Sequence, residues 1–134
     1  MADDERRREL IDLTLRFTDA FNRDDLDAVM AFFTPDAVYD EFNGRRNAGT
    51  PAIRAAFEPQ FRGDFGRIRF VSEDLFVDAG CDQALIRWVC TIESNGRTRA
   101  WRGLDVLRFD GRLVCEKHTY AKAAVPLLGE VEKS

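Results

Sequence analysis

Four side chains of this 134-residue sequence could carry acid–base chemistry: Glu41, Asp105, His118 and Tyr120. A carboxylate such as Glu41, placed beside the aromatic Tyr39, is suited to remove a proton next to a carbonyl group if it reaches an apolar cavity. A buried carboxylic acid that keeps its proton can donate a hydrogen bond to a developing oxyanion. Histidine exchanges protons near neutral pH, and a tyrosine hydroxyl can donate. We expect these four residues to form the catalytic group.

Each candidate also has a purely structural interpretation. Glu41 could mark the exposed mouth of a strand, and His118 could be a surface residue. Asp105 could pair with Arg87, Arg102 or a pocket tyrosine, and Tyr120 could pack in the core. These alternatives stay open on the sequence alone.

Apolar spacing and turn signals predict the elements that position these residues. An apolar stripe favours a helix over residues 5–22, and a short helix from Leu26 to Phe33 is expected to stop at Thr34-Pro35-Asp36. Thr50-Pro51 begins a third helix, which Pro59 and Gly63 end. Strands are predicted over 37–42, 67–78, 82–93, 97–109 and 112–123, with Tyr39 and Glu41 on one face of the first and Phe42 on the other. Helices followed by hairpins indicate an α+β domain with helices on one face of a curved sheet.

The Asn95-Gly96 pair predicts a two-residue turn and therefore fixes the pairing of its two strands. The resulting face is apolar and aromatic but contains one carboxylate, and its opposed pairs are Cys90 with Trp101, Trp88 with Gly103, and Ile86 with Asp105. Gly103 would leave space for a ring or a ligand. The neighbouring arginines Arg87, Arg102 and Arg108 alternate onto the other face. We therefore expect Asp105 to be buried without a cation and to keep its proton.

Two registers are open for the last hairpin. A strict Asp110-Gly111 turn places four residues on the Asp105 face, namely Val114, Glu116, His118 and Tyr120. A three-residue loop with a bulge presents Leu113, Cys115, Lys117 and Thr119 instead. We prefer the first register, because an aromatic Tyr120 suits a buried face better than Lys117.

Composition narrows the class of protein. There are 20 Lys+Arg against 24 Asp+Glu, a net charge of −4, which disfavours nucleic-acid binding. No apolar run could cross a membrane, the charged N-terminus does not resemble a signal peptide, and Cys81, Cys90 and Cys115 lack disulfide or metal spacing. We expect one cytoplasmic domain over 1–134, with a C-terminal tail over 126–134, no metal and no cofactor.

Three stretches resemble one known family. Residues 17–39 resemble the opening of the nuclear transport factor 2-like superfamily, which includes SnoaL-like proteins and ketosteroid isomerase. Residues 49–54 resemble its third-helix start, and residues 103–114 resemble its closing hairpin. The resemblance implies a cystatin-like α+β cone: a cone-shaped barrel of a strongly curved, mainly antiparallel sheet, with three N-terminal helices enclosing a pocket.

The same resemblance carries over to individual residues. Glu41 falls where ketosteroid isomerase keeps its carboxylate base, and Asp105 falls where it keeps a protonated aspartic acid. Its oxyanion-hole tyrosine is replaced by Phe17. Against limonene epoxide hydrolase, Asp105 matches one carboxylate, but Gly103 and Thr119 replace an arginine and an aspartate.

We therefore expect a hydrophobic pocket for a small apolar ligand. Its predicted lining is Phe17, Phe21, Phe33, Tyr39, Phe57, Trp88, Cys90 and Trp101. The predicted function is a cofactor-independent isomerase, dehydratase or cyclase acting on an apolar carbonyl compound. The alternative is a non-catalytic binding or dimeric interaction module of the same fold. A homodimer is expected through the opposite sheet face, which carries Leu85, Val89, Leu104 and Val106.

Overall fold

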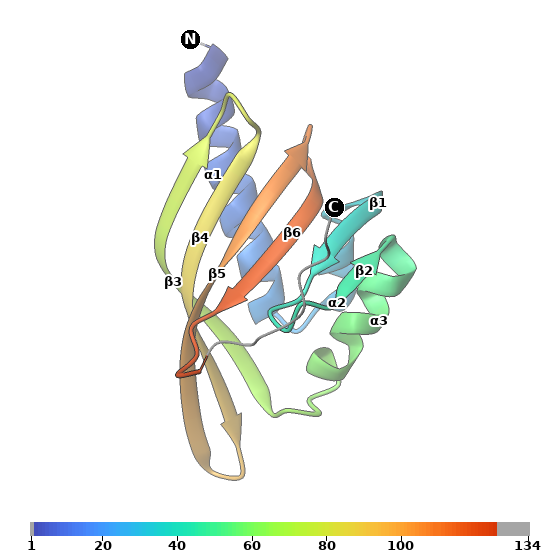
Figure 1. The fold of residues 1–134 in the computed structure, drawn as a ribbon, viewed down its shortest axis with the longest axis vertical. Coiled ribbons are helices and arrows are strands. Elements are labelled where there is room, and N and C mark those ends of the chain that lie inside the picture. Colours follow the sequence, from blue (N-terminus) through green and yellow to red (C-terminus); the bar gives the residue numbers. More distant parts are fainter. Residues whose placement is uncertain (1, 126–134) are drawn as a thin grey trace.

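The computed structural model describes residues 2–125 of the chain (Figure 1), and the tail expected over 126–134 lies outside the described residues. Within these described residues, three helices and six strands follow one another in chain order. They are α1 (Ala2–Asn22), α2 (Leu26–Met30), β1 (Phe33–Asp40), β2 (Arg46–Ala48), α3 (Thr50–Phe61), β3 (Arg67–Asp78), β4 (Gln83–Ser94), β5 (Arg97–Asp110) and β6 (Leu113–Ala121). Within the described part of the chain, no helix is long and apolar enough to cross a membrane.

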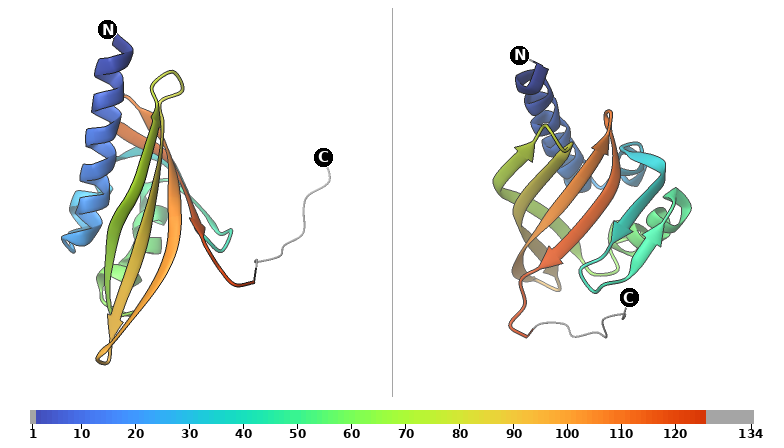
Figure 2. Two further views of the ribbon diagram at one scale, coloured as in Figure 1. Left: turned by 90° about the vertical axis from the view of Figure 1, so that its left-hand side faces the viewer. Right: turned by 45° about the horizontal axis from the view of Figure 1, so that its top comes forward.

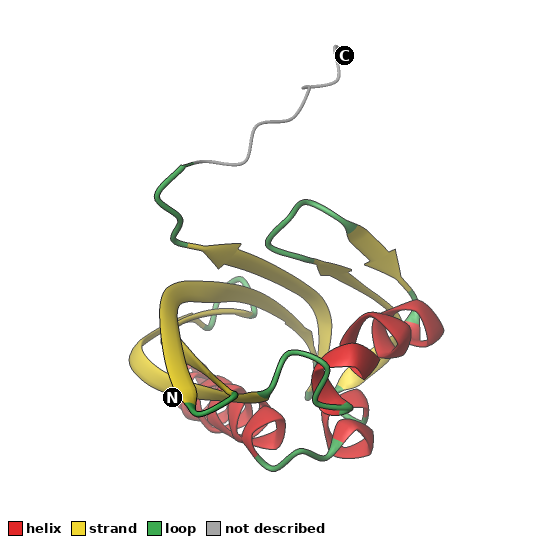
Figure 3. Cartoon of the chain, turned by 90° about the horizontal axis from the view of Figure 1, so that it is seen from below, coloured by secondary structure: helices red, strands yellow, loops and turns green. Residues whose placement is uncertain are grey.

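The strands form one curved sheet in the order β2-β1-β6-β5-β4-β3. Only the β1–β6 pair is parallel, and the other four pairs are antiparallel. The three helices lie on one side of this unclosed sheet (Figures 2 and 3), so we name that side the inner face and the other the outer face. The predicted α+β class is confirmed.

The first strand differs most from its prediction. It begins at Phe33, so that α2 ends at Met30, and it runs through Pro35 to Asp40. Pro35 is tolerated because β2 pairs with β1 only from Val38 onward, and the β1–β6 pairing is irregular between Phe33 and Val38. The short strand β2 was not predicted.

Proline also fails to end α3 where the sequence suggested. The helix begins at Thr50, with Gly49 at its N-cap, and continues past Pro59 to Phe61. Pro59 lies in the last turn of the helix, where its missing N–H removes one helical hydrogen bond. The helix ends two residues later, so no further turn is disturbed.

The predicted β4–β5 register is confirmed at every position. Cys90 faces Trp101, Trp88 faces Gly103, and Ile86 faces Asp105. The turn residues Asn95 and Gly96 have φ of 53° and 75°, as a type I′ turn requires. The space at Gly103 is filled by the Trp88 ring, since a Cβ built there would lie 2.5 Å from its Cη2 atom.

The preferred register for β6 is wrong. Asp110 pairs with Leu113, so the turn residues are Gly111 and Arg112, and Phe109 then faces Val114. The next pair is Arg108 with Glu116, which leaves Cys115 as a bulge.

The bulge decides which β6 side chains point inward. Val114 is fully buried before it, and Lys117 and Thr119 point inward after it, so that Thr119 faces Asp105. One extra residue thus moves His118 and Tyr120 to the outer face, because side chains alternate along a strand.

Replacing Gly103 by alanine should destabilise the fold by about 2 kcal/mol or more, since the added methyl would meet the Tyr120 carbonyl oxygen and the Trp88 ring. Urea unfolding followed by circular dichroism measures this loss. Gly80→Ala is the control, because the nearest atom to its Cβ is an Asp78 side-chain oxygen at 3.4 Å. Equal stabilities of the two variants would contradict the close packing at Gly103.

Candidate functional site

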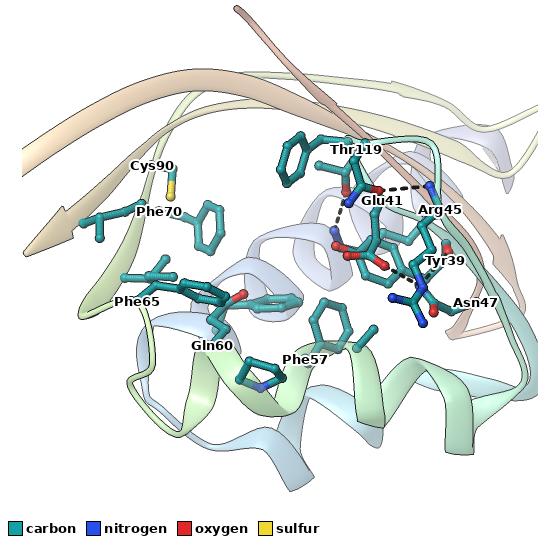
Figure 4. A pocket seen from close by; sticks show the side chains of 18 of the residues that line it. Tyr39, Glu41, Arg45, Asn47, Phe57, Gln60, Phe65, Phe70, Cys90 and Thr119 are labelled. Carbon is teal, nitrogen blue, oxygen red and sulfur yellow. Dashed lines mark hydrogen bonds between the residues drawn. The ribbon is translucent and has the colours of Figure 1, made fainter. Parts of the chain in front are cut away.

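A cavity of about 740 Å³ lies between the inner face of the sheet and α3 (Figure 4). Most of its wall is aromatic or aliphatic, and this part consists of Phe21, Phe42, Phe57, Phe65, Ile68, Phe70, Trp88, Ile92 and Trp101, with alanines of α3. The volume is within the range of small-molecule sites, and the apolar wall suits a ligand with a hydrophobic body.

One end of this cavity is polar. Tyr39 comes from β1, Glu41 follows the end of β1, Asn47 lies on β2, and Thr119 lies on β6 (Figure 4). The Asn47 side-chain Nδ2 donates to Glu41 Oε2 at 3.0 Å and so orients the carboxylate. The pairing of β1 with both β2 and β6 brings these segments together.

Lys117 supplies a buried positive charge beside this end. Its Nζ donates to Asp105 Oδ1 at 3.0 Å and to Thr119 Oγ1 at 2.7 Å. It also lies 4.5 Å from the centroid of the Tyr39 ring, a cation–π contact. Lys117 both lines the cavity and is 5% exposed, so its ammonium group is held in place.

The surroundings shift two pKa values in the same direction. Burial is the largest single influence and lowers the pKa of Lys117, but the charges of Asp105, Tyr39 and Glu41 and the hydrogen bond to Asp105 together outweigh it, so that the net shift is upward. Burial raises the pKa of the Tyr39 hydroxyl, against the opposing charge of Lys117. Lys117 therefore stays charged and Tyr39 stays a donor at neutral pH.

Asp105 is a fully satisfied carboxylate behind the cavity wall. Besides Lys117, it accepts hydrogen bonds from Thr119 Oγ1 at 2.6 Å and from Trp88 Nε1 at 3.1 Å. The expectation of a buried carboxyl without a cation is therefore wrong, because the β6 bulge turns Lys117 inward. Asp105 is absent from the cavity lining, and the group facing the ligand is Lys117.

His118 and Tyr120 lie outside the cavity. His118 is on the outer face, where its Nδ1 is 2.8 Å from Asp40 Oδ2 and its Nε2 is 2.9 Å from Glu116 Oε1. Tyr120 is 58% exposed. The expectation that these two residues face the pocket is wrong, since it depended on the unbulged register.

The predicted apolar lining divides into two groups. Six of its members line the cavity: Phe21, Tyr39, Phe57, Trp88, Cys90 and Trp101. Phe17 and Phe33 belong instead to the closed core, with ring centroids 5.4 Å apart. Burial raises the pKa of the Cys90 thiol, which keeps it protonated and poorly nucleophilic.

Sequence reasoning missed several lining residues. Lys117 and Thr119 were assigned to the rejected register, and Asn47 lies on the unpredicted strand β2. Phe42 was expected on the outer face, but the chain turns after Asp40 and packs Phe42 edge-on against Trp101, with centroids 5.0 Å apart. In residues 2–125, no group of three His, Cys, Asp or Glu side chains is arranged to hold a metal ion.

Comparison with models of known protein families identifies the family of this chain. Residues 14–116 match the model of the SnoaL-like domain. The chain belongs to the SnoaL-like family. The resemblance seen in the sequence is thereby confirmed. No curated protein matches the sequence.

Solved structures share the SnoaL-like fold. A candidate polyketide cyclase from Xanthomonas campestris pv. campestris is 22% identical, with 86% of this chain and 91% of that chain covered and a TM-score of 0.73. An NTF2-like protein of unknown function from Mesorhizobium loti is 24% identical, with 88% of this chain and 94% of that chain covered and a TM-score of 0.73. A protein with a cystatin-like fold from Methylobium petroleophilum PM1 is 20% identical, covering 95% of this chain and 83% of that chain at a TM-score of 0.71. At these identities the likeness shows the fold alone.

Replacing Lys117 by methionine in this SnoaL-like chain should cost about 3–5 kcal/mol of unfolding free energy, since Asp105 would keep a buried charge without its partner. The folded-state pKa of Lys117 is raised, so the wild-type advantage is complete below its ordinary value of 10.5 and falls as the pH rises above it. Denaturant unfolding at pH 8 to 11 measures both effects.

Two further variants test this interpretation. The double variant Asp105→Asn/Lys117→Met should recover most of the lost stability, because it buries no charge. Lys122→Met, at an exposed position, should change stability by less than about 0.5 kcal/mol. A loss below about 1 kcal/mol for Lys117→Met alone would contradict a buried ion pair.

Proposed function

We propose that this chain is a cofactor-independent acid–base enzyme that acts on an apolar carbonyl compound. The observation that carries the proposal is the polar end of the cavity, where the Glu41 carboxylate and the Lys117 ammonium group line one largely apolar space. Glu41 acts as the base, and Lys117 faces the oxygen on which negative charge develops. The candidate polyketide cyclase among the structural neighbours is consistent with chemistry of this kind.

Glu41 has the surroundings of a usable base. Its carboxylate accepts a hydrogen bond from Asn47, and among the described residues no cation lies within ion-pair distance of it. It therefore keeps lone pairs free for a ligand proton while its orientation is fixed. Removal of a proton from the carbon next to a carbonyl moves the C–H electron pair into an enolate, whose oxygen carries the charge.

Lys117 is suited to stabilise that oxygen. Two of its three N–H groups are used by Asp105 and Thr119, and the third is available beside the Tyr39 ring. A fixed charge in an apolar surrounding stabilises an oxyanion more strongly than water does, and it needs no rearrangement during the reaction. The proton held by Glu41 then returns to another carbon in an isomerisation or goes to the leaving group in an elimination. In a cyclisation the enolate carbon bonds to a second carbonyl carbon of the substrate, and the proton goes to the alkoxide that this attack forms.

The direct test uses an apolar bicyclic ketone, 2-tetralone, in deuterated water. The wild type should speed exchange of the protons next to the carbonyl, as followed by proton NMR. Glu41→Gln should lower the catalysed rate by about 100-fold or more while leaving the fold intact, because the amide cannot accept the proton.

Glu58→Gln is the matched control, since Glu58 is exposed on α3 and does not line the cavity. It should leave the exchange rate unchanged. Full activity in Glu41→Gln would remove Glu41 from the base role. No exchange above background in the wild type would favour the alternative, a binding protein without catalysis.

We also propose that two copies of the chain pair through the outer sheet face. This face exposes Val71 and Phe76 of β3 and Tyr120 of β6, each more than half accessible. Between them lie half-buried apolar residues of β4 and β5, namely Leu85, Val89, Leu104 and Val106. All three helices lie on the inner face, so none of them covers these strands (Figure 3).

Sedimentation equilibrium at micromolar concentration should return twice the 15.3 kDa of one chain. Val89→Arg should shift the distribution to single chains, because it places a charge in the centre of the proposed interface. Leu15→Arg changes an exposed residue of α1 in the same way and should leave the dimer intact. A wild-type species of one chain's mass would refute the pairing.

A further inference from the structure

The charges around the cavity do not match those of the whole chain. The protein carries a net charge of −4. Among residues 2–125, the cavity lining nevertheless has three cationic side chains, Arg45, Arg99 and Lys117, against the single carboxylate of Glu41. Lys117 forms an ion pair with Asp105 behind the wall, which leaves the two arginines without a carboxylate partner.

Neither arginine has a carboxylate within ion-pair distance among the described residues, although neighbouring arginines do. Arg46 follows Arg45 in sequence and pairs with Asp40 at 2.8 Å. Arg102 lies three residues after Arg99 on the same strand and pairs with Glu73 at 3.2 Å. Arg46 and Arg102 thus meet acidic partners outside the cavity, whereas Arg45 and Arg99 line it.

The two unpaired arginines line the same cavity but come from different elements. Arg45 belongs to the loop between β1 and β2, and Arg99 belongs to β5. Phe42 of that loop packs against Trp101, which shares the inner face of β5 with Arg99 two residues away. Figure 4 shows Arg45 beside Glu41 and Asn47 at the polar end.

From this arrangement we infer that the ligand is an organic acid, with an apolar body and an anionic group that Arg45 and Arg99 attract. The aromatic wall accepts the body, and guanidinium groups at the edge of an apolar space favour a carboxylate, sulfonate or phosphate through charge and paired hydrogen bonds. The inference rests on the proposed function, because it specifies the substrate class of the same site as an acidic carbonyl compound.

Two probes that differ by one anionic group test the inference. They are 8-anilinonaphthalene-1-sulfonate and its neutral analogue N-phenyl-1-naphthylamine. Binding in the cavity is detected through the indole N–H signals in nitrogen-15 NMR, since the chain has 2 tryptophans and both line the cavity. The wild type should bind the sulfonate more tightly than the neutral probe, and added salt should reduce this preference.

Arg45→Gln/Arg99→Gln should weaken sulfonate binding by about tenfold and leave the neutral probe within about twofold. Arg7→Gln/Arg8→Gln removes the same charge from exposed positions of α1 and should change neither affinity. An equal loss in both double variants, or an unchanged sulfonate affinity in the first, would overturn the inference.

The remaining outcomes separate the inference from the proposed function. If the neutral probe moves the indole signals and binds as tightly as the sulfonate, the inferred preference for an acid is overturned. The proposed enzyme function is not affected by that result. If neither probe moves the indole signals of the wild type, the apolar pocket itself fails, and both proposals fail with it.

Discussion

The ion pair between Lys117 and Asp105 determines much of the surrounding structure. Moving two charges out of water is costly, and the cost is offset only when every polar atom of the pair has a partner. Here Trp88 and Thr119 provide hydrogen bonds, and the Tyr39 ring gives the ammonium group a cation–π contact that leaves its third N–H for a ligand. The Trp88 indole can reach Asp105 only because residue 103 has no side chain.

The same requirement accounts for the irregular last strand. Val114 and Lys117 are both buried, although they are three residues apart and would lie on opposite faces of a regular strand. The bulge at Cys115 resolves this conflict, and it also places His118 between two carboxylates on the outer face. The inward position of Lys117 therefore also determines which β6 side chains face the cavity and which lie on the face proposed to meet a second chain.

Much of the fold could be predicted because local signals agreed with one another. The apolar stripe gave the first helix, and Asn95-Gly96 fixed the pairing that brings Trp88, Gly103 and Asp105 together. The β6 register could not be predicted by ranking Tyr120 above Lys117 as a buried residue. A better signal was present: Asp105 needed a cation, its neighbouring arginines faced away, and Lys117 is the only Lys or Arg residue of β6. Strand β2 carried no such signal, since three polar and small residues resemble a loop.

The position of β6 also has a consequence for the time at which a working site can exist. This strand is the last element of the described chain, yet it lies between β1 and β5 and joins the two parts of the sheet. Glu41 and Asn47 leave the ribosome about seventy residues before Lys117 and Thr119, and contacts between residues so far apart in sequence are slow to form. Until β6 inserts, β1 lacks a neighbour on that side and Asp105 lacks its cation. The polar end of the cavity is thus complete only once β6 has inserted, which links completion of the sheet to the appearance of the binding site.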